Sequence, residues 1–418
     1  MSDETYVIVG ASLAGAKAAE TLRAEGFTGR VVLIGEETEP PYERPPLSKG
    51  YLSGAEPREK AFVHEPHWYV EHDIEWRAGT LAVELDLAAR TVSTLPTDTV
   101  RYDKLLLATG SRVRTLTTPG SNLEGVRYLR TLDQSDALLA GFREGAQVVV
   151  IGAGWIGLET AAAARQHGCT VTVVEMDSLP LRRVLGDEVA TVYRDLHAAH
   201  GVDFRFGAGV QEIKGVDGAV TGVLLEDGWE VAADLVVVGV GIRPAVELAE
   251  AAGLEVDNGI VTDENLRTSD PHVWACGDVA SSFNPLLGTR LRVEHWANAL
   301  NAGPAAARSM LGKGKPYDRV PYFFSDQYDL GMEYSGWVAP GEYDQVVFRG
   351  EPGTAEAGTA PEFLAFWVKG GAVLAGMNAN VWDVTETIAD LVRAGLTGRT
   401  VDLAALADPE VPLADVLG

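Results

Sequence analysis

The feature that most constrains the fold is a strand, glycine turn, helix and strand pattern that occurs twice. The first copy occupies residues 6–34 and the second occupies residues 147–174. Each begins with an uninterrupted apolar run, 6–9 and 148–151, as expected for a parallel strand that is buried on both faces. Two such units in one chain predict two doubly wound, Rossmann-like α/β domains.

The first glycine turn has the form of a dinucleotide-binding fingerprint. Such a fingerprint needs one glycine at the tight turn and another where the helix packs on the strand. Between them it needs a small residue, because the backbone there approaches a pyrophosphate. Glu36, just after the second strand, can accept the hydroxyls of an adenosine ribose. The alternative is a tight turn with Glu36 solvated. The predicted contacts of the turn are Gly10, Ser12, Leu13, Ala14 and Gly15.

The second turn matches the same fingerprint completely, with Gly152, Gly154 and Gly157. Glu175 ends the following strand, where a carboxylate suits the free 2′-hydroxyl of NADH and repels the 2′-phosphate of NADPH. Arg183 lies in the next loop and either contacts the nucleotide or is solvated. The pattern favours NADH as the second dinucleotide.

The rest of the chain predicts a third, α+β domain. Aromatic residues concentrate after residue 320, the stretch 350–361 predicts a mobile loop, and residues 385–394 predict an amphipathic helix. The expected domains are a discontinuous domain that carries the first dinucleotide fingerprint, a domain that carries the second, and a C-terminal domain. Their expected bounds are 1–111 with 245–319, 112–244, and 320–418.

Charge and composition exclude several functions. A formal charge of −26 disfavours nucleic acid and anionic membranes as partners. No apolar run approaches the roughly 18 residues that span a bilayer. The start of the chain lacks a basic signal region, so we expect a cytoplasmic protein. The only two cysteines, Cys169 and Cys276, form no metal or dithiol motif, and we expect no metal site.

Six further motifs carry a family resemblance. They are Ala108-Thr109-Gly110, Gly239–Pro244, Cys276-Gly277-Asp278, Pro41–Lys49, Glu294-His295-Trp296 and Phe324–Tyr328. With the two fingerprints, they make the chain resemble the flavoproteins with two dinucleotide-binding domains, a family that includes glutathione reductase. More specifically, the chain resembles the branch that reduces ferredoxin, putidaredoxin and rubredoxin, and the resemblance covers essentially the whole chain.

The resemblance implies FAD at the first fingerprint and NADH at the second. Asp278 would then bind the flavin side chain or pyrophosphate, although an Asp that caps the next helix fits the local sequence equally. Trp155 would either shield the flavin or pack in the core. The FAD contacts implied are Ala14, Glu36, Arg44, Lys49, Val83, Thr109, Gly110, Arg130, Asp278 and Trp296. The nicotinamide contacts implied are Gly154, Ile156, Glu159, Glu175 and Gly241.

Lys49 and Glu159 are the candidate catalytic residues. The resemblance places Lys49 near flavin N5, where a cation would stabilise the anionic reduced flavin. We hypothesise that Glu159 pairs with Lys49 and that the pair rearranges when NADH enters. The alternatives are a surface lysine and a simple carboxylate near a helix start.

The absence of a cysteine indicates what accepts the electrons. Disulfide reductases of the wider family have a cysteine pair in the stretch that here reads Arg44–Lys49, which contains none. We therefore expect electrons to leave singly for a 2Fe-2S ferredoxin that serves a haem-thiolate monooxygenase or a Rieske dioxygenase. An NADH oxidase or small-molecule reductase, and a non-catalytic NADH sensor of the apoptosis-inducing-factor type, are the alternatives.

The partner surface is less defined by the sequence. Phe324 occupies a position where some relatives have a tryptophan between flavin and ferredoxin. The densest basic segment could dock an acidic ferredoxin, or could be scattered solubilising charge. That segment contains Arg290, Arg292, Arg308, Lys313 and Lys315. Two complete nucleotide sites in one chain make a monomer sufficient.

Overall fold

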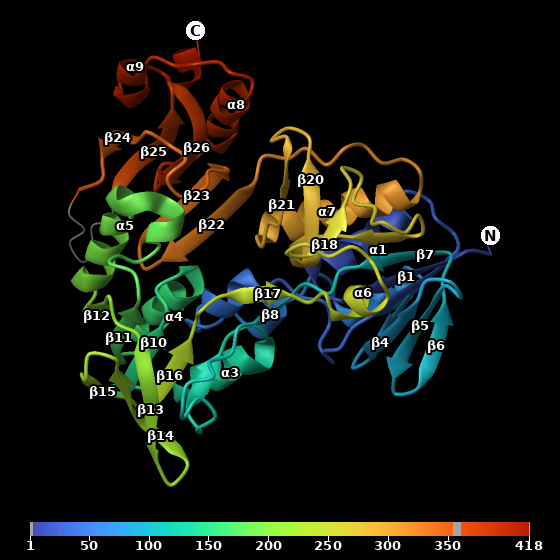
Figure 1. Ribbon diagram of the computed structural model, residues 1–418, viewed down its shortest axis with the longest axis horizontal. Helices are drawn as coiled ribbons and strands as arrows, with labels where there is room; N and C mark the ends of the chain where they lie inside the picture. Colours follow the sequence, from blue (N-terminus) through green and yellow to red (C-terminus); the bar gives the residue numbers. More distant parts are fainter. Residues whose placement is uncertain (1–2, 354–360, 418) are drawn as a thin grey trace. The chain divides into compact units, whose positions relative to one another are not determined.

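The computed structural model describes residues 3–353 and 361–417 (Figure 1). Most of the loop predicted over 350–361 therefore lies outside the described residues. Among the described residues, no helix combines the length and the apolar character that crossing a membrane requires.

The chain divides into two compact units. The first unit consists of Met1–Arg44, Arg58–Arg112 and Ile242–Pro321. The second unit consists of Pro45–Pro57, Val113–Gly241 and Tyr322–Gly418. The short segment Pro45–Pro57, which begins with the 3-10 helix η1 (Pro45–Ser48), thus packs with the second unit although its sequence lies inside the first predicted nucleotide domain.

A five-stranded parallel sheet is the centre of the first unit, with strand order β19-β7-β1-β2-β3. Tyr6 and Ile8 of β1 enter one core cluster, which helices α1 and α7 also line, and Val7 and Val9 enter a second cluster. Both faces of the sheet are therefore buried, which explains the continuous apolar runs. The bounds are β1 (Thr5–Val9), α1 (Leu13–Ala24), β2 (Arg30–Ile34), β3 (Ile74–Arg77), β7 (Lys104–Leu107), β19 (Val273–Ala275) and α7 (Trp296–Met310).

Two smaller sheets complete the first unit. Strands β4 (Leu81–Asp86), β5 (Thr91–Leu95) and β6 (Asp98–Arg101) are antiparallel, and β18 (Ile260–Thr262) pairs with β20 (Ala280–Asn284), which pairs with β21 (Thr289–Leu291). The short helices are η2 (Arg58–Ala61), α2 (Pro66–Glu71), α6 (Glu247–Ala251) and η3 (Gly277–Val279). Strands β8 (Ser111–Val113) and β17 (Ile242–Pro244) lie where the chain passes between units.

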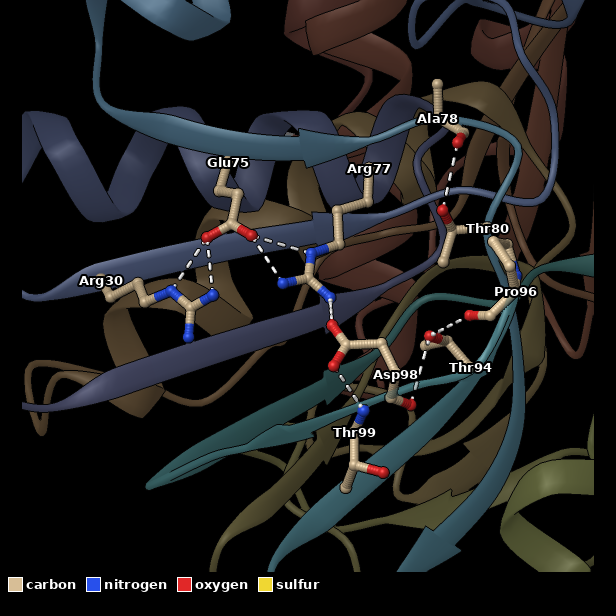
Figure 2. Close-up of polar contacts among 9 residues, drawn as sticks. All are labelled: Arg30, Glu75, Arg77, Ala78, Thr80, Thr94, Pro96, Asp98 and Thr99. Carbon is tan, nitrogen blue, oxygen red and sulfur yellow. Dashed lines mark hydrogen bonds and ion pairs between the residues drawn. The ribbon is translucent and has the colours of Figure 1, made fainter.

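An ion-pair network joins the parallel sheet to the β5–β6 turn (Figure 2). Arg77 of β3 lies 2.7 Å from Glu75 and 2.6 Å from Asp98, and Arg30 of β2 pairs with Glu75 at 2.8 Å. Burial alone would raise the pKa of Glu75, but the hydrogen bonds from Arg77 and Arg30 lower it. Arg77 therefore bridges two sheets through one planar guanidinium.

We predict that Arg77→Gln lowers the melting temperature by about 1–3 °C. A single partly exposed ion pair contributes little to stability, but Arg77 belongs to a network with two carboxylates, so its loss should be measurable. Thermal unfolding at low and high salt measures the effect, which should shrink as salt screens the charges. Arg101→Gln, on the exposed edge strand β6, is the matched control. An equal loss in both variants would mean that the network adds nothing specific.

The second unit repeats the doubly wound arrangement. Its parallel sheet has the order β12-β11-β10-β16-β9, and β10 is followed by α4 and β11. The bounds are β9 (Val126–Tyr128), α3 (Leu132–Gly141), β10 (Gln147–Ile151), α4 (Trp155–Gln166), β11 (Thr170–Glu175), α5 (Arg182–Ala199), β12 (Val202–Phe206), β13 (Val210–Val216), β14 (Ala219–Leu225), β15 (Glu230–Ala232) and β16 (Leu235–Val238). Strands β13, β14 and β15 form a separate antiparallel sheet.

The C-terminal segment, orange to red in Figure 1, forms a five-stranded antiparallel sheet with the order β22-β23-β26-β25-β24. The strand β22 contacts α4, and the buried Trp367 donates its Nε1–H to the carbonyl of Leu185 at 3.1 Å. The bounds are β22 (Tyr322–Gln327), β23 (Leu330–Gly336), β24 (Gln345–Glu351), β25 (Glu362–Lys369), β26 (Ala372–Ala379), α8 (Thr385–Leu396), α9 (Leu403–Ala407) and η4 (Leu413–Leu417). The predicted fold class, with two doubly wound regions and a C-terminal α+β region, is confirmed.

Candidate active site

The first glycine turn has a geometry that only glycine fits. Gly10 has a φ of +118°, and a Cβ there would lie 2.0 Å from the carbonyl oxygen of Ala108. A Cβ on Gly15 would lie 1.9 Å from the carbonyl oxygen of Gly10. In the described structure, Ser12 makes no side-chain cap on α1, and its hydroxyl donates to the carbonyl of Tyr42 at 3.2 Å. The helix start thus fits an anionic group such as a pyrophosphate.

The second turn shows the same requirements and one informative difference. A Cβ on Gly152 would lie 2.5 Å from the carbonyl oxygen of Gly239, and one on Gly157 would lie 2.0 Å from that of Gly152. A Cβ on Gly154 would meet no described atom within 4 Å. Packing of the chain therefore does not require Gly154, whereas a pyrophosphate at the start of α4 requires the space it leaves.

The acidic residues lie at the strand ends, as the fingerprints predict. Glu175 accepts hydrogen bonds from the backbone N–H of Ala153 at 2.7 Å and of Asp177 at 2.9 Å. Glu36 pairs with Arg112 at 3.3 Å, and the exposed Arg183 pairs with Asp177 at 2.6 Å. The carboxylate of Glu175 is thereby fixed beside the second glycine turn, and its contact with ribose stays a prediction.

Several other predicted FAD contacts belong to the first unit. Trp296 donates its Nε1–H to Glu43 at 2.8 Å, and Arg44 lies 4.8 Å from the ring centre of Tyr42. Thr109 donates its hydroxyl to the carbonyl of Ala245 at 2.8 Å, and Asp278 lies in η3. These contacts fix the side chains locally and leave their roles toward a flavin as predictions.

The remaining predicted contacts differ in exposure. Val83 of β4 is exposed, Leu13 and Ala14 are buried in α1, and Gly110 has a positive φ. In the second unit, Ile156 is exposed at the start of α4, Arg130 follows β9, and Gly241 also has a positive φ.

A buried ion pair is the chemical centre of the second unit. Lys49 Nζ lies 2.8 Å from Glu159 Oε1, and the Glu159 side chain is only 3% exposed. Ser48 donates to Oε2 of the same carboxylate at 2.5 Å, and Ser325 donates to Oε1 at 2.7 Å. The ion pair hypothesised from the sequence is therefore present, and three donors satisfy the buried carboxylate.

An aromatic ring lies beside the lysine of this pair, and other rings of the same unit pack on one another. The ammonium of Lys49 lies 5.4 Å from the ring centre of Phe324. Trp155 makes edge contacts with Tyr193 at 5.5 Å and with Phe323 at 5.2 Å between ring centres. Trp155 is half-buried and packs against two aromatic rings of this unit, and its role as a flavin shield stays a prediction.

Neither cysteine takes part in the cluster. Burial raises the pKa of Cys276 to about 12, so its thiol is not a nucleophile at neutral pH. Cys169 is buried and its Sγ donates to the carbonyl of Arg143 at 3.4 Å. Within residues 3–353 and 361–417, no group of three or more metal-ligating side chains is arranged to hold a metal ion.

The basic segment is largely committed to internal contacts. Arg290 donates to the carbonyls of Thr262 and Ser281, and Arg292 pairs with Glu294. Arg308 and Lys313, each about half exposed, both pair with Glu25, at 2.8 and 3.3 Å. Only part of the segment therefore presents exposed positive charge.

Comparison with known proteins places this site in a family. The family model described as pyridine nucleotide-disulphide oxidoreductase matches residues 4–303, and a second, described as reductase C-terminal, matches residues 322–417. The chain belongs to the pyridine nucleotide-disulphide oxidoreductase family. It is thus an oxidoreductase, and the predicted family and the predicted cofactors, FAD and NADH, are confirmed.

The similar proteins match over most of their length. The chain is 40% identical over 415 residues to the ferredoxin–NAD(+) reductase component of the anthranilate 1,2-dioxygenase system of Burkholderia cepacia, covering 99% of each. It is 37% identical to putidaredoxin reductase of Pseudomonas putida, covering 90% of this chain and 88% of the relative. It also matches a covalent putidaredoxin reductase–putidaredoxin complex with a TM-score of 0.92 and 34% identity, covering 100% and 99%.

Sequence reasoning missed the residues that support Glu159. Ser325 and Gln327 lie in the motif Phe324–Tyr328, which indicated the family but suggested no role for them. Because the two residues are two positions apart on a predicted strand, the sequence could have predicted that both side chains lie on the same face of the sheet. Nothing in the local sequence singles out His197, which is fully buried and lies 2.7 Å from Gln327 Oε1.

We predict that His197 makes stability depend on pH. Burial lowers its pKa from 6.5 to about 4. Below pH 6.5 the histidine is protonated in the unfolded chain, but in the folded chain it stays neutral down to about pH 4. The free energy of unfolding therefore keeps the full contribution of the neutral His197 above pH 6.5 and decreases as the pH falls below that value. The loss is on the order of 3 kcal/mol.

Melting temperatures at pH 7 and pH 4.5 measure this effect. The advantage of the natural chain over His197→Gln should shrink at the lower pH. The same change at the exposed His67 is the control. A difference between the natural chain and His197→Gln that is equal at both pH values would contradict the prediction.

Proposed function

We propose that this enzyme passes electrons from NADH to a 2Fe-2S ferredoxin that supplies an oxygenase, either a haem-thiolate monooxygenase or a Rieske dioxygenase. The observation that carries the proposal is the cluster around Lys49 and Glu159, which contains no thiol. Without a sulfur relay, electrons must leave for an acceptor outside the chain. Similarity over the full length to named ferredoxin reductases supports this acceptor.

Each nucleotide would be held by residues already described. FAD, when bound, would supply the chemistry that takes an electron pair from NADH as hydride and releases the electrons one at a time. The start of α1 with Glu36 and Asp278 would hold FAD, and the start of α4 with Glu175 would hold NADH. We further propose the domain bounds 1–111 with 245–319, 112–244 and 320–418, a monomer, and a cytoplasmic location.

Lys49 and Glu159 would set the charge of the site. The buried Glu159 carboxylate holds the lysine ammonium in one position, because both groups are withdrawn from water. A fixed cation favours negative charge that develops nearby during reduction. We propose that entry of NADH rearranges this pair.

We predict that Lys49→Met slows flavin reduction by NADH by roughly tenfold or more, because the fixed cation is lost. Anaerobic stopped-flow absorbance measures the rate at equal flavin content. Lys60→Met, at an exposed lysine of the first unit, is the matched control and should reduce normally. An unchanged rate in Lys49→Met would remove the proposed role.

Arg308 and Lys313 would contribute to docking an acidic ferredoxin. Both remain half exposed although they pair with Glu25. Charges at the rim of an interface mainly raise the association rate and are screened by salt. Such a local basic surface would have to overcome the overall charge of −26.

We predict that raising salt, or the double change Arg308→Gln with Lys313→Gln, weakens ferredoxin-dependent turnover by roughly twofold to fivefold in kcat/KM. Reduction of ferricyanide should be unaffected, because this small acceptor needs no docking surface. Arg393→Gln on α8, about equally exposed, is the control. Loss of both activities together would point to a folding defect and against a docking role.

The same assays separate the two alternative functions. Steady oxygen consumption without ferredoxin would favour an NADH oxidase, and slow reduction with a long-lived charge-transfer band would favour an NADH sensor. Burial of both cysteines counts against a thiol-dependent oxidase. Mixing the NADH-reduced enzyme with ferredoxins under anaerobic conditions tests the main proposal directly.

A further inference from the structure

A continuous chain of buried hydrogen bonds runs from Glu159 into helix α5. Ser325 contacts Glu159 at 2.7 Å, Gln327 Nε2 contacts Ser325 Oγ at 3.0 Å, and Gln327 Oε1 contacts His197 Nε2 at 2.7 Å. The hydroxyl of Tyr328 lies 3.4 Å from His197 Nδ1. The three middle residues are no more than 1% exposed.

The fold brings these residues together from separate elements of the second unit. Ser325 and Gln327 are two residues apart on strand β22, so their side chains lie on the same face of the C-terminal sheet. Their partners are Glu159 on α4 and His197 on α5. Tyr193, one helical turn before His197, is also fully buried and contacts Trp155 at its edge.

The charge of Glu159 fixes the direction of every bond in this chain. An ionised carboxylate only accepts, so Ser325 must spend its single hydroxyl proton on Glu159. Ser325 can then only accept from Gln327, which turns the amide NH₂ toward Ser325 and the amide oxygen toward His197. That oxygen needs a donor, so His197 carries a proton on Nε2. Burial lowers the pKa of His197 and keeps the ring neutral at pH 7, so Nδ1 carries no proton and accepts from the hydroxyl of Tyr328.

We propose that Ser325, Gln327 and His197 are positioning residues for the NADH reaction, holding the Glu159 carboxylate on Lys49 through one-way hydrogen bonds. The inference rests on the proposed role of the Lys49–Glu159 pair. Every hydrogen bond has both a donor and an acceptor only in this direction. In the reverse direction Ser325 would donate to Gln327, and its oxygen would face the Glu159 carboxylate with no proton between them. Breaking the chain removes one of the three donors that hold Glu159, so the carboxylate is fixed less tightly on Lys49.

The ring protonation of His197 gives a test that does not depend on turnover. Nitrogen-15 NMR of the flavin-loaded enzyme, labelled at histidine and assigned with His197→Gln, should show one neutral tautomer protonated at Nε2 at pH 7. Protonation at Nδ1 would mean that the chain runs the other way and that Ser325 does not donate to Glu159. That result overturns the proposal.

A double-mutant cycle tests whether Ser325 acts through Glu159. Ser325→Ala alone should slow flavin reduction by roughly threefold to tenfold, because Glu159 loses a donor. In the Glu159→Gln background the same change should have little further effect. Ser335→Ala, an equally buried serine on the neighbouring strand β23, is the matched control and should leave the rate unchanged.

The outcomes separate this inference from the proposed function. If Glu159→Gln leaves reduction unchanged, the role of the ion pair fails and the inference fails with it. If Glu159→Gln slows reduction but Ser325→Ala does not, or adds independently, only the positioning inference fails. Should Ser325→Ala not fold, Gln327→Glu replaces it, since it keeps the acceptor for His197 and removes the donor to Ser325.

Discussion

The second unit depends on one buried carboxylate. Glu159 is almost completely withdrawn from water, and an ionised group at such a site is costly unless charge and hydrogen bonds compensate it. Its donors come from two distant parts of the sequence, with Lys49 and Ser48 in one segment and Ser325 in β22. Removing one partner of a buried ion pair costs about 3–5 kcal/mol. This requirement gives a reason why Pro45–Pro57 packs with the second unit.

The parts of the fold that were predictable are those that local chemistry dictates. Gly10 and Gly152 adopt backbone angles that other residues avoid, so the two turns are visible in the sequence. The four apolar residues of β1 and of β10 reflect burial on both faces of a sheet, which leaves a continuous signature. The Lys49–Glu159 pair was also anticipated, but only through the resemblance to a family.

The parts that escaped prediction depend on contacts between residues far apart in the chain. The hydrogen bonds between Gln327 and His197, and between Ser325 and Glu159, require the packed positions of β22, α4 and α5. The basic segment was visible, but the pairing of Arg308 and Lys313 with Glu25 was not. The periodicity of a sequence does not identify a partner that lies hundreds of residues away, so such networks become visible only in the folded structure.

The position of Ser325 in the C-terminal sheet has a consequence for how this protein can evolve or be engineered. A recombination event that joins the nucleotide-binding half of one homologue to the terminal half of another would replace the strand that supplies this hydroxyl. Such a hybrid would keep Lys49, Glu159 and both dinucleotide turns, yet its carboxylate would face whatever side chain the new strand offered. If Ser325 has the proposed positioning role, modular exchange at this junction favours donors with a matching serine.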